Sequence, residues 1–211
     1  MAAFSGPNIA QTGLVMNLDA GDLLSYPGTG TTVTDLTRNN NNGTLTGSPG
    51  YTASVGGYFS FTGSNNITYT NSSLIPSADF TIDTWVYYTT TAQSNFANIG
   101  NESSNRIVFF AFNNSIQYNI YGAGSVTMST GFVNNVWNHV VITRTGSTII
   151  SYTNGVPGTS LTLSGGLGNA NGTTIMSNSG NVAIYRYYQG VGLTQSQVLQ
   201  NFNAIRSRYG L

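Results

Sequence analysis

The sequence of 211 residues contains no cysteine and no lysine, and only 6% of its residues are charged. Without cysteine, disulfide bonds and thiolate metal sites are excluded. Basic and acidic residues number six each, so the chain lacks the basic surface that binds a phosphate backbone. Nucleic acid is therefore not an expected partner.

Long apolar runs are also missing. No apolar stretch approaches the roughly 20 residues of a membrane-spanning helix, and no basic amphipathic helix suits a membrane surface. The N-terminus has neither the cationic nor the apolar segment of a secretory signal peptide. We therefore expect no membrane partner and synthesis without a signal peptide.

What is present favours an all-β domain. The chain is 39% hydrophobic and 12% aromatic, which argues against the disorder that low charge would otherwise suggest. Strands are expected at residues 13–18, 80–88, 106–112, 115–121, 136–144, 148–153 and 182–188. Tight turns are expected at Asn113-Asn114, Gly146 and Asn154-Gly155, because these residue types tolerate positive φ. The polar stretch from Gly21 to Gly50 is expected to be an irregular loop.

One helix is expected, at residues 195–208. Thr194 can cap it, and Gln197 completes a capping box. Its apolar face is predicted to consist of Val198, Leu199, Phe202 and Ile205, and to cover an end or an edge of a sandwich. We expect residues 1–12 to form an N-terminal arm and residues 13–211 a single domain.

Several segments, in a fixed order, resemble one known family. They are residues 13–20 (GLVMNLDA), 25–30 (SYPGTG), 41–45 (NNGTL), 80–86 (FTIDTWV), 137–141 (WNHVV) and 193–203 (LTQSQVLQNFN). The chain resembles the laminin-G-like, concanavalin A-like jelly-roll family, in the versions common in structural proteins of marine and cyanobacterial phages. This resemblance implies a two-sheet antiparallel jelly-roll sandwich with one short C-terminal helix.

The chain departs from the family pattern at residues 61–67. Thr62 and Asn66 stand where the family usually has acidic residues. An acid-dependent or cation-linked role for this loop is therefore not expected here.

Catalytic residues are not expected. Jelly-roll glycoside hydrolases need two carboxylates placed across a sugar, on alternate residues of a strand. Asp83 has no second carboxylate at that spacing within its strand, and Asp79 is expected at the strand's edge. The single histidine, His139, supplies at most one metal ligand and is expected to be a strand residue. Asp83 is expected to make a polar contact.

A calcium site is a weaker possibility that the sequence leaves open. Asp19, Asp22 and Asp35 lie in Gly-rich and Asn-rich stretches, where carboxylate, amide and carbonyl oxygens can surround a hard cation. No Asp-x-Asp-x-Asp ladder accompanies them, and the same residues can cap turns. Apart from this candidate site, no cofactor is expected.

The candidate interaction residues are tyrosines on strands and two arginines near the C-terminus. They are Tyr87, Tyr88, Tyr185, Tyr187, Tyr188, Arg206 and Arg208. Alternate residues of a strand face opposite sides, so some of these rings are expected outside. Tyrosine serves both sugar and protein partners, and the sequence leaves both open.

The resemblance and the composition together predict a non-enzymatic virion structural protein. We expect an oligomeric capsid decoration or tail-associated adhesion module, made in the host cytoplasm, that contacts other virion proteins. A surface with few long charged side chains suits a dense assembly, because ordering such chains costs entropy. The alternative is a glycan-binding receptor-recognition domain of a tail fibre, and the third is a polysaccharide-cleaving glycoside hydrolase.

Overall fold

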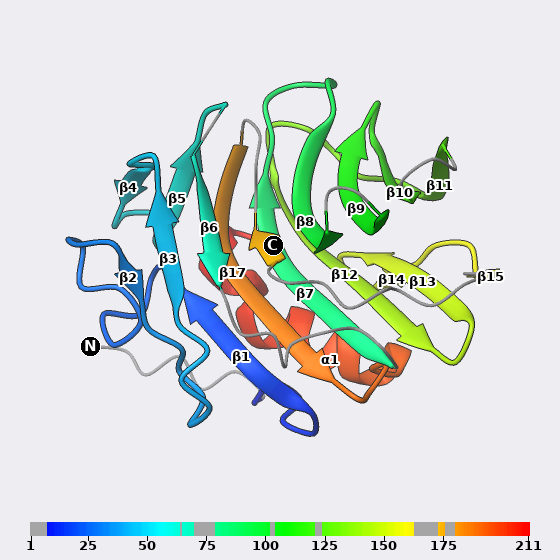
Figure 1. Ribbon diagram of the computed structural model, residues 1–211, viewed down its shortest axis with the longest axis horizontal. Helices are drawn as coiled ribbons and strands as arrows, with labels where there is room; N and C mark the ends of the chain where they lie inside the picture. Colours follow the sequence, from blue (N-terminus) through cyan, green and yellow to red (C-terminus); the bar gives the residue numbers. More distant parts are fainter. Residues whose placement is uncertain are drawn as a thin grey trace.

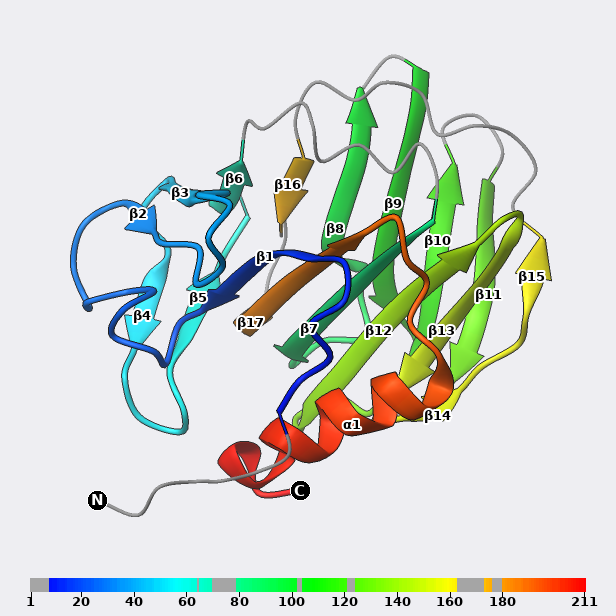
Figure 2. The same ribbon diagram turned by 90° about the horizontal axis from the view of Figure 1, so that it is seen from below.

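The computed structural model describes residues 8–63, 65–69, 79–101, 104–120, 124–162, 173–175 and 180–211. Within them the chain forms two antiparallel sheets that pack face to face, with helix α1 on the outside of one sheet (Figures 1 and 2). The fold is the concanavalin A-like jelly-roll sandwich with a short C-terminal helix that the sequence predicts.

Sheet A has the order β14-β13-β12-β7-β17-β5-β4, with β1 beside β17 and β15 beside β13. Its strands are β1 (Leu14–Asp19), β4 (Gly50–Thr52), β5 (Tyr58–Phe61), β7 (Phe80–Tyr87), β12 (Trp137–Thr145), β13 (Thr148–Thr153), β14 (Val156–Pro157), β15 (Leu161–Thr162) and β17 (Gly180–Gln189).

Sheet B has the order β11-β10-β9-β8-β16-β6-β3-β2. Its strands are β2 (Thr32–Val33), β3 (Gly43–Thr46), β6 (Asn66–Tyr69), β8 (Ser94–Asn101), β9 (Ser104–Phe112), β10 (Ser115–Ile120), β11 (Gly124–Thr130) and β16 (Thr173–Ile175).

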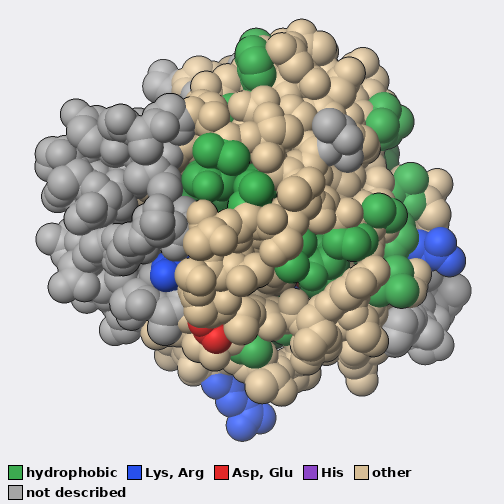
Figure 3. Space-filling view, turned by 90° about the vertical axis from the view of Figure 1, so that its right-hand side faces the viewer, with side chains coloured by type: hydrophobic (Ala, Val, Ile, Leu, Met, Phe, Trp, Pro, Cys, Tyr) green, Lys and Arg blue, Asp and Glu red, His purple; other side chains and the backbone are tan. Residues whose placement is uncertain are grey.

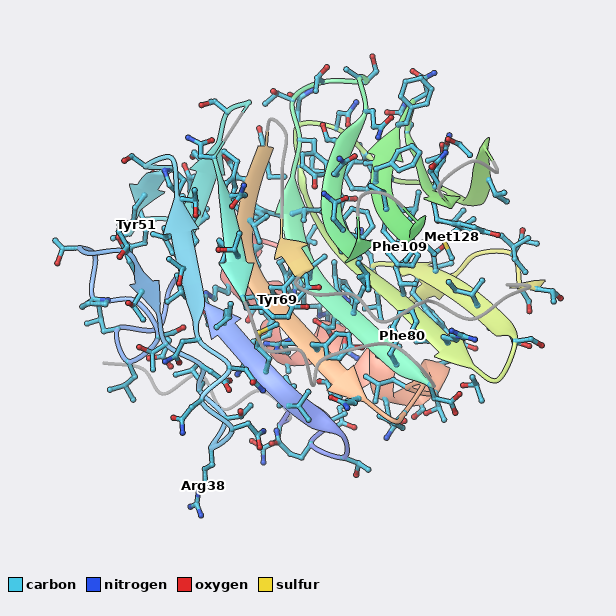
Figure 4. All side chains as sticks on the ribbon, in the orientation of Figure 1. Arg38, Tyr51, Tyr69, Phe80, Phe109 and Met128 are labelled. Atoms are coloured by element: carbon cyan, nitrogen blue, oxygen red, sulfur yellow. The ribbon has the colours of Figure 1, made fainter. Side chains whose placement is uncertain are left out.

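The main core lies between the two sheets. Alternate side chains of β7, including Phe80 and Ile82, meet side chains of sheet B such as Phe109 of β9. The rings of Phe80 and Phe109, both labelled in Figure 4, lie 6.4 Å apart and are fully buried. The period of two that suits a sandwich strand thus places one face of β7 in this core.

The predicted hairpin turns are confirmed. Asn113 and Asn114 both adopt positive φ between β9 and β10, as a two-residue primed turn requires. Asn154 and Gly155 do the same between β13 and β14. The stretch from Gly21 to Gly50 differs from expectation, because strands β2 and β3 form within it.

The helix α1 (Gln195–Ile205) is followed by one 3-10 turn, η1 (Arg206–Tyr209). Thr194 and Gln197 form the predicted capping box. The predicted apolar face is wrong at Leu199, which is 44% exposed, whereas the polar Asn201 is fully buried. The helix covers the outer face of sheet A (Figure 2), not an end or an edge of the sandwich.

Candidate functional site

A buried carboxylate lies under helix α1, on the outer face of sheet A. Asp83 of β7 is opposite Arg186 of β17 in the sheet register, and Arg186 Nη1 donates to Asp83 Oδ1 over 3.1 Å. His139 of β12 places its Nε2 3.2 Å from the same oxygen. All three side chains are buried. The sequence did not identify Arg186 as the partner of Asp83. The one feature that points to it is its position as the single cation in an apolar and aromatic strand.

Asn201 joins this cluster to the helix and to the N-terminal segment. Its Nδ2 donates to Asp83 Oδ2 over 2.7 Å and to the Tyr188 hydroxyl over 2.9 Å. Its Oδ1 accepts the Ala10 amide over 2.7 Å, and the Tyr188 hydroxyl donates to the Ala10 carbonyl. Residues 8–11, expected to belong to an arm, therefore pack against the domain; residues 1–7 lie outside the described residues.

The electrostatics of the cluster keep Asp83 ionised. Burial alone would raise the pKa of Asp83, but the neighbouring His139 and Arg186, with the hydrogen bond from Asn201, lower it to about 2. Because the carboxylate is fully enclosed, it cannot meet a substrate in this conformation. The cluster therefore secures α1 to sheet A, and Asp83 makes the polar contact expected of it.

The three calcium candidates each have a structural partner. Asp35 accepts hydrogen bonds from the amides of Asn17, Thr37 and Asn41, and from the Thr37 hydroxyl. These bonds fasten the loop before β3 to the free edge of β1, next to the Val15 carbonyl that accepts from Thr37 and Asn41.

Asp19 and Asp22 are used differently. Asp19 forms a two-pronged ion pair with Arg208, with Nη1 and Nη2 at 2.7 and 2.6 Å from its two oxygens. Asp22 accepts the Leu24 amide over 2.9 Å and so caps a turn. Among the described residues, no group of three or more His, Cys, Asp or Glu side chains is placed to hold a metal ion.

Some of the five candidate tyrosines were expected outside, but four of them are buried and only Tyr87 is partly exposed. Tyr88, Tyr185, Tyr187 and Tyr188 are at most 1% exposed. Tyr185 and Tyr187 belong to the core between the sheets, and Tyr188 lies under α1. Because α1 covers the outer face of sheet A, strand β17 is buried on both faces. Burial raises the pKa of the Tyr88 and Tyr185 hydroxyls, which keeps them neutral.

The two candidate arginines also differ from each other. Arg208 is partly buried in its ion pair with Asp19 and donates from Nε to the Gly56 carbonyl over 2.7 Å, so it ties together parts of its own chain. Arg206 is exposed, with its guanidinium 5.9 Å from the centre of the Phe202 ring.

Tyr87 is the candidate tyrosine that stays partly exposed, and it belongs to an aromatic group at the end of sheet A that lies beyond α1. Its ring lies 5.7 Å from that of Trp137, which is 5.5 Å from that of Tyr58. Trp137 also contacts Tyr209 of η1 at 4.7 Å and is buried, with 7% of its surface exposed, so Tyr58 and Tyr87 are the members of this group that solvent reaches. We call Tyr58, Tyr87 and Trp137 the aromatic platform.

Polar side chains continue the platform across the sheet. The register pairs Trp137 with Tyr87, Tyr87 with Asn181, and Asn181 with Ser60. These four residues thus form one row across β12, β7, β17 and β5, with neighbours about 4.8 Å apart. Asn181 and Ser60 are half-buried. The row therefore has the half-buried Tyr87, packed on the buried Trp137, at one end and an amide and a hydroxyl at the other.

Comparison with protein families identifies the fold family. Residues 61–191 match the Laminin_G_3 model, described as the concanavalin A-like lectin/glucanases superfamily. The chain belongs to this family. No curated protein matches its sequence.

Solved structures share the fold of this concanavalin A-like chain. Domain 4 of AbnA, an extracellular arabinanase from Geobacillus stearothermophilus, in complex with arabinotriose, is 18% identical with a TM-score of 0.69, over 92% of this chain and 100% of that one. The binding domain of Paraclostridial Mosquitocidal Protein 1 is 16% identical with a TM-score of 0.69, and the match covers 91% of this chain and 52% of that one. Trypanosoma rangeli sialidase is 14% identical with a TM-score of 0.68, and the match covers 96% of this chain and 34% of that one.

These similarities concern the fold. The chain spans about half of the mosquitocidal binding domain and about a third of the sialidase. Binding domains and an enzyme are both among the similar structures. No helix among the described residues is long and apolar enough to cross a membrane.

Proposed function

We propose that this chain is a non-enzymatic carbohydrate-binding module that uses the aromatic platform. The observation that carries the proposal is the row of Trp137, Tyr87, Asn181 and Ser60 in one register across four strands. Sugar rings present apolar C–H faces that pack on aromatic rings, while their hydroxyls bond to amides and hydroxyls. A short glycan lying across the strands would meet both kinds of group.

A binding role without catalysis agrees with the use of the carboxylates. Hydrolysis of a glycosidic bond requires two carboxyl groups on either side of it. Asp83 is enclosed under α1, Asp19 is paired with Arg208, and Asp35 accepts four hydrogen bonds. Asp79 accepts the Gly146 amide over 2.7 Å. None of these groups adjoins the platform in the sheet register.

The test is glycan binding by platform variants. The wild-type protein is screened on a glycan array, and the best neutral ligand is titrated against the double variant Tyr58→Ala, Tyr87→Ala. We expect at least a tenfold weaker affinity, or about 1.4 kcal/mol, because the rings supply the packing surface. Tyr51→Ala is the matched control, since Tyr51 is also half-buried but packs on Phe59 toward the core.

Two results would count against the proposal. One is a wild-type protein that binds no neutral glycan on a broad array. The other is a control variant that loses as much affinity as the double variant, because the loss would then reflect weakened folding.

We further propose that the module works on the surface of a phage particle, as a capsid decoration or tail-associated adhesion protein. Support comes from the family resemblance and from the nearly uncharged composition. The described part of the face in Figure 3 is mostly uncharged polar and backbone surface with scattered apolar side chains. Mass spectrometry of purified virions is the test, and absence of the chain from the particles would exclude this placement.

A further inference from the structure

A groove opens beside strand β1, at a different place from the aromatic platform. It has a volume of about 460 Å³, within the roughly 300–1,000 Å³ range of small-ligand sites. Its walls are the segment that begins at Ile9, the strand β1, and the loop that carries Arg38. All of its lining residues lie in the described part of the chain.

The groove is lined by three aliphatic side chains and by a larger set of polar ones. Ile9, Leu14 and Leu36 are half-buried and present aliphatic surface. Asn17 uses its Oδ1 to accept from Arg186 Nε over 3.2 Å, which leaves its amide NH2 for a ligand. Asn39 bonds through Nδ2, at 3.2 Å to the Val15 carbonyl and 3.1 Å to Thr37 Oγ1, which leaves its Oδ1 as an acceptor.

Arg38 supplies the only charge among the lining residues. It is exposed, extends from its loop into solvent (Figure 4), and takes part in none of the ion pairs formed among the described residues. The nearest acid in the sequence is Asp35, which is buried and already accepts four hydrogen bonds. A guanidinium can bind a carboxylate through two parallel hydrogen bonds.

We propose that this groove is a separate binding site for a sugar acid, either a uronic acid or a sialic acid. The carboxylate binds Arg38 and the Asn17 amide, a ring hydroxyl donates to Asn39 Oδ1, and the C–H face packs on the aliphatic side chains. A neutral sugar can make the last two contacts but has no carboxylate to pair with Arg38. The acid should therefore bind more tightly than a neutral sugar.

The test is a ¹⁵N NMR titration with three methyl glycosides: galacturonic acid, N-acetylneuraminic acid and neutral galactose. We expect one of the two acids to shift the amides of residues 36–39 and to bind at least tenfold more tightly than galactose; which acid does so identifies the source. Arg38→Ala should weaken acid binding at least tenfold. Arg38→Lys should recover part of the affinity, because it keeps the charge but loses the fork. Raising the salt concentration should weaken binding of the acid.

Arg206→Ala is the matched control, because it removes another exposed arginine at the far end of α1. Equal losses in the two variants, or equal affinity for galactose and the acids, would overturn the proposal, as would acid binding unchanged in Arg38→Ala. The Tyr58→Ala, Tyr87→Ala variant keeps this site intact. Failure of the platform and failure of the groove therefore give separate results.

Discussion

At the scale of single residues, Asp83 shows how a buried charge can serve architecture. An isolated carboxylate under a helix would be costly, because desolvation disfavours the charged form. Arg186 supplies the opposite charge, His139 Nε2 lies 3.2 Å from the same oxygen, and Asn201 donates to the second oxygen. The cluster pairs the charge within the fold, so a residue that resembles a catalytic acid in sequence has no access to a ligand.

Replacing Asp83 by Asn should lower the free energy of unfolding by about 3–5 kcal/mol, since it leaves Arg186 buried without its countercharge. Urea unfolding at neutral pH measures the change. Asp22→Asn is the control and should change stability little, because Asn can still accept the Leu24 amide. A small effect at Asp83 would show that Arg186 finds another partner.

The same residue predicts a pH dependence. The pKa of Asp83 is lowered from 3.8 to about 2 in the folded protein. Its contribution is therefore complete above about pH 4 and is lost as the pH falls toward 2, by about 2 kcal/mol in total. Urea unfolding between pH 2 and 6 measures how the free energy of unfolding changes with pH. This change should be smaller in Asp83→Asn.

At the scale of elements, helix α1 determines which parts of sheet A are exposed. Val198 packs in the cluster with Val141 and Tyr152, and Phe202 stacks on Trp85 at a centroid distance of 5.9 Å. The helix thereby buries β17, and η1 continues this cover over Trp137, whereas Tyr87 stays half-buried.

The attachment of α1 depends on a polar residue. Asn201→Ala removes the acceptor for the Ala10 amide and the donor to Asp83, so we expect a loss of about 2–4 kcal/mol in unfolding free energy. Amide hydrogen exchange should also become faster at residues 8–11. Asn203→Ala, at an exposed position of the same helix, is the control and should leave both measurements nearly unchanged. Equal exchange in the two variants would contradict this account.

At the scale of the whole molecule, Arg208 joins segments that are far apart in the chain. It pairs with Asp19, the last residue of β1, and donates to the Gly56 carbonyl before β5. Gly21 and Gly56 lie so close to the arginine that an added Cβ would clash with it. The Arg208 guanidinium thus attaches the C-terminal segment to the end of β1 and to the loop before β5.

Arg208→Lys should therefore destabilise the protein by about 1–3 kcal/mol, because an ammonium cannot reproduce the two-pronged pairing with Asp19. Thermal unfolding measures the effect. The exposed Arg206→Lys provides the comparison and should unfold near the wild-type temperature. A similar shift in both variants would show that the contacts of Arg208 with Asp19 and Gly56 add little.

Local patterns determined much of this architecture. The hairpin at Asn113-Asn114 and the capping box at Thr194 and Gln197 depend on φ preferences and on hydrogen bonds within a few residues. The turn and the cap follow from the sequence alone because each is built from neighbours along the chain. The jelly roll, whose strands are far apart in the chain, is indicated instead by the resemblance of the ordered segments to a known family.

Only the tertiary structure decided what each polar or aromatic residue does. Tyr87 and Tyr188 look alike in sequence, yet α1 buries Tyr188, whereas Tyr87 stays partly exposed. The pairing of Asp83 with Arg186 spans 103 positions, and the row from Trp137 to Ser60 depends on strand order. Burial and charge pairing arise from contacts between distant segments, and no local pattern encodes which segments will meet.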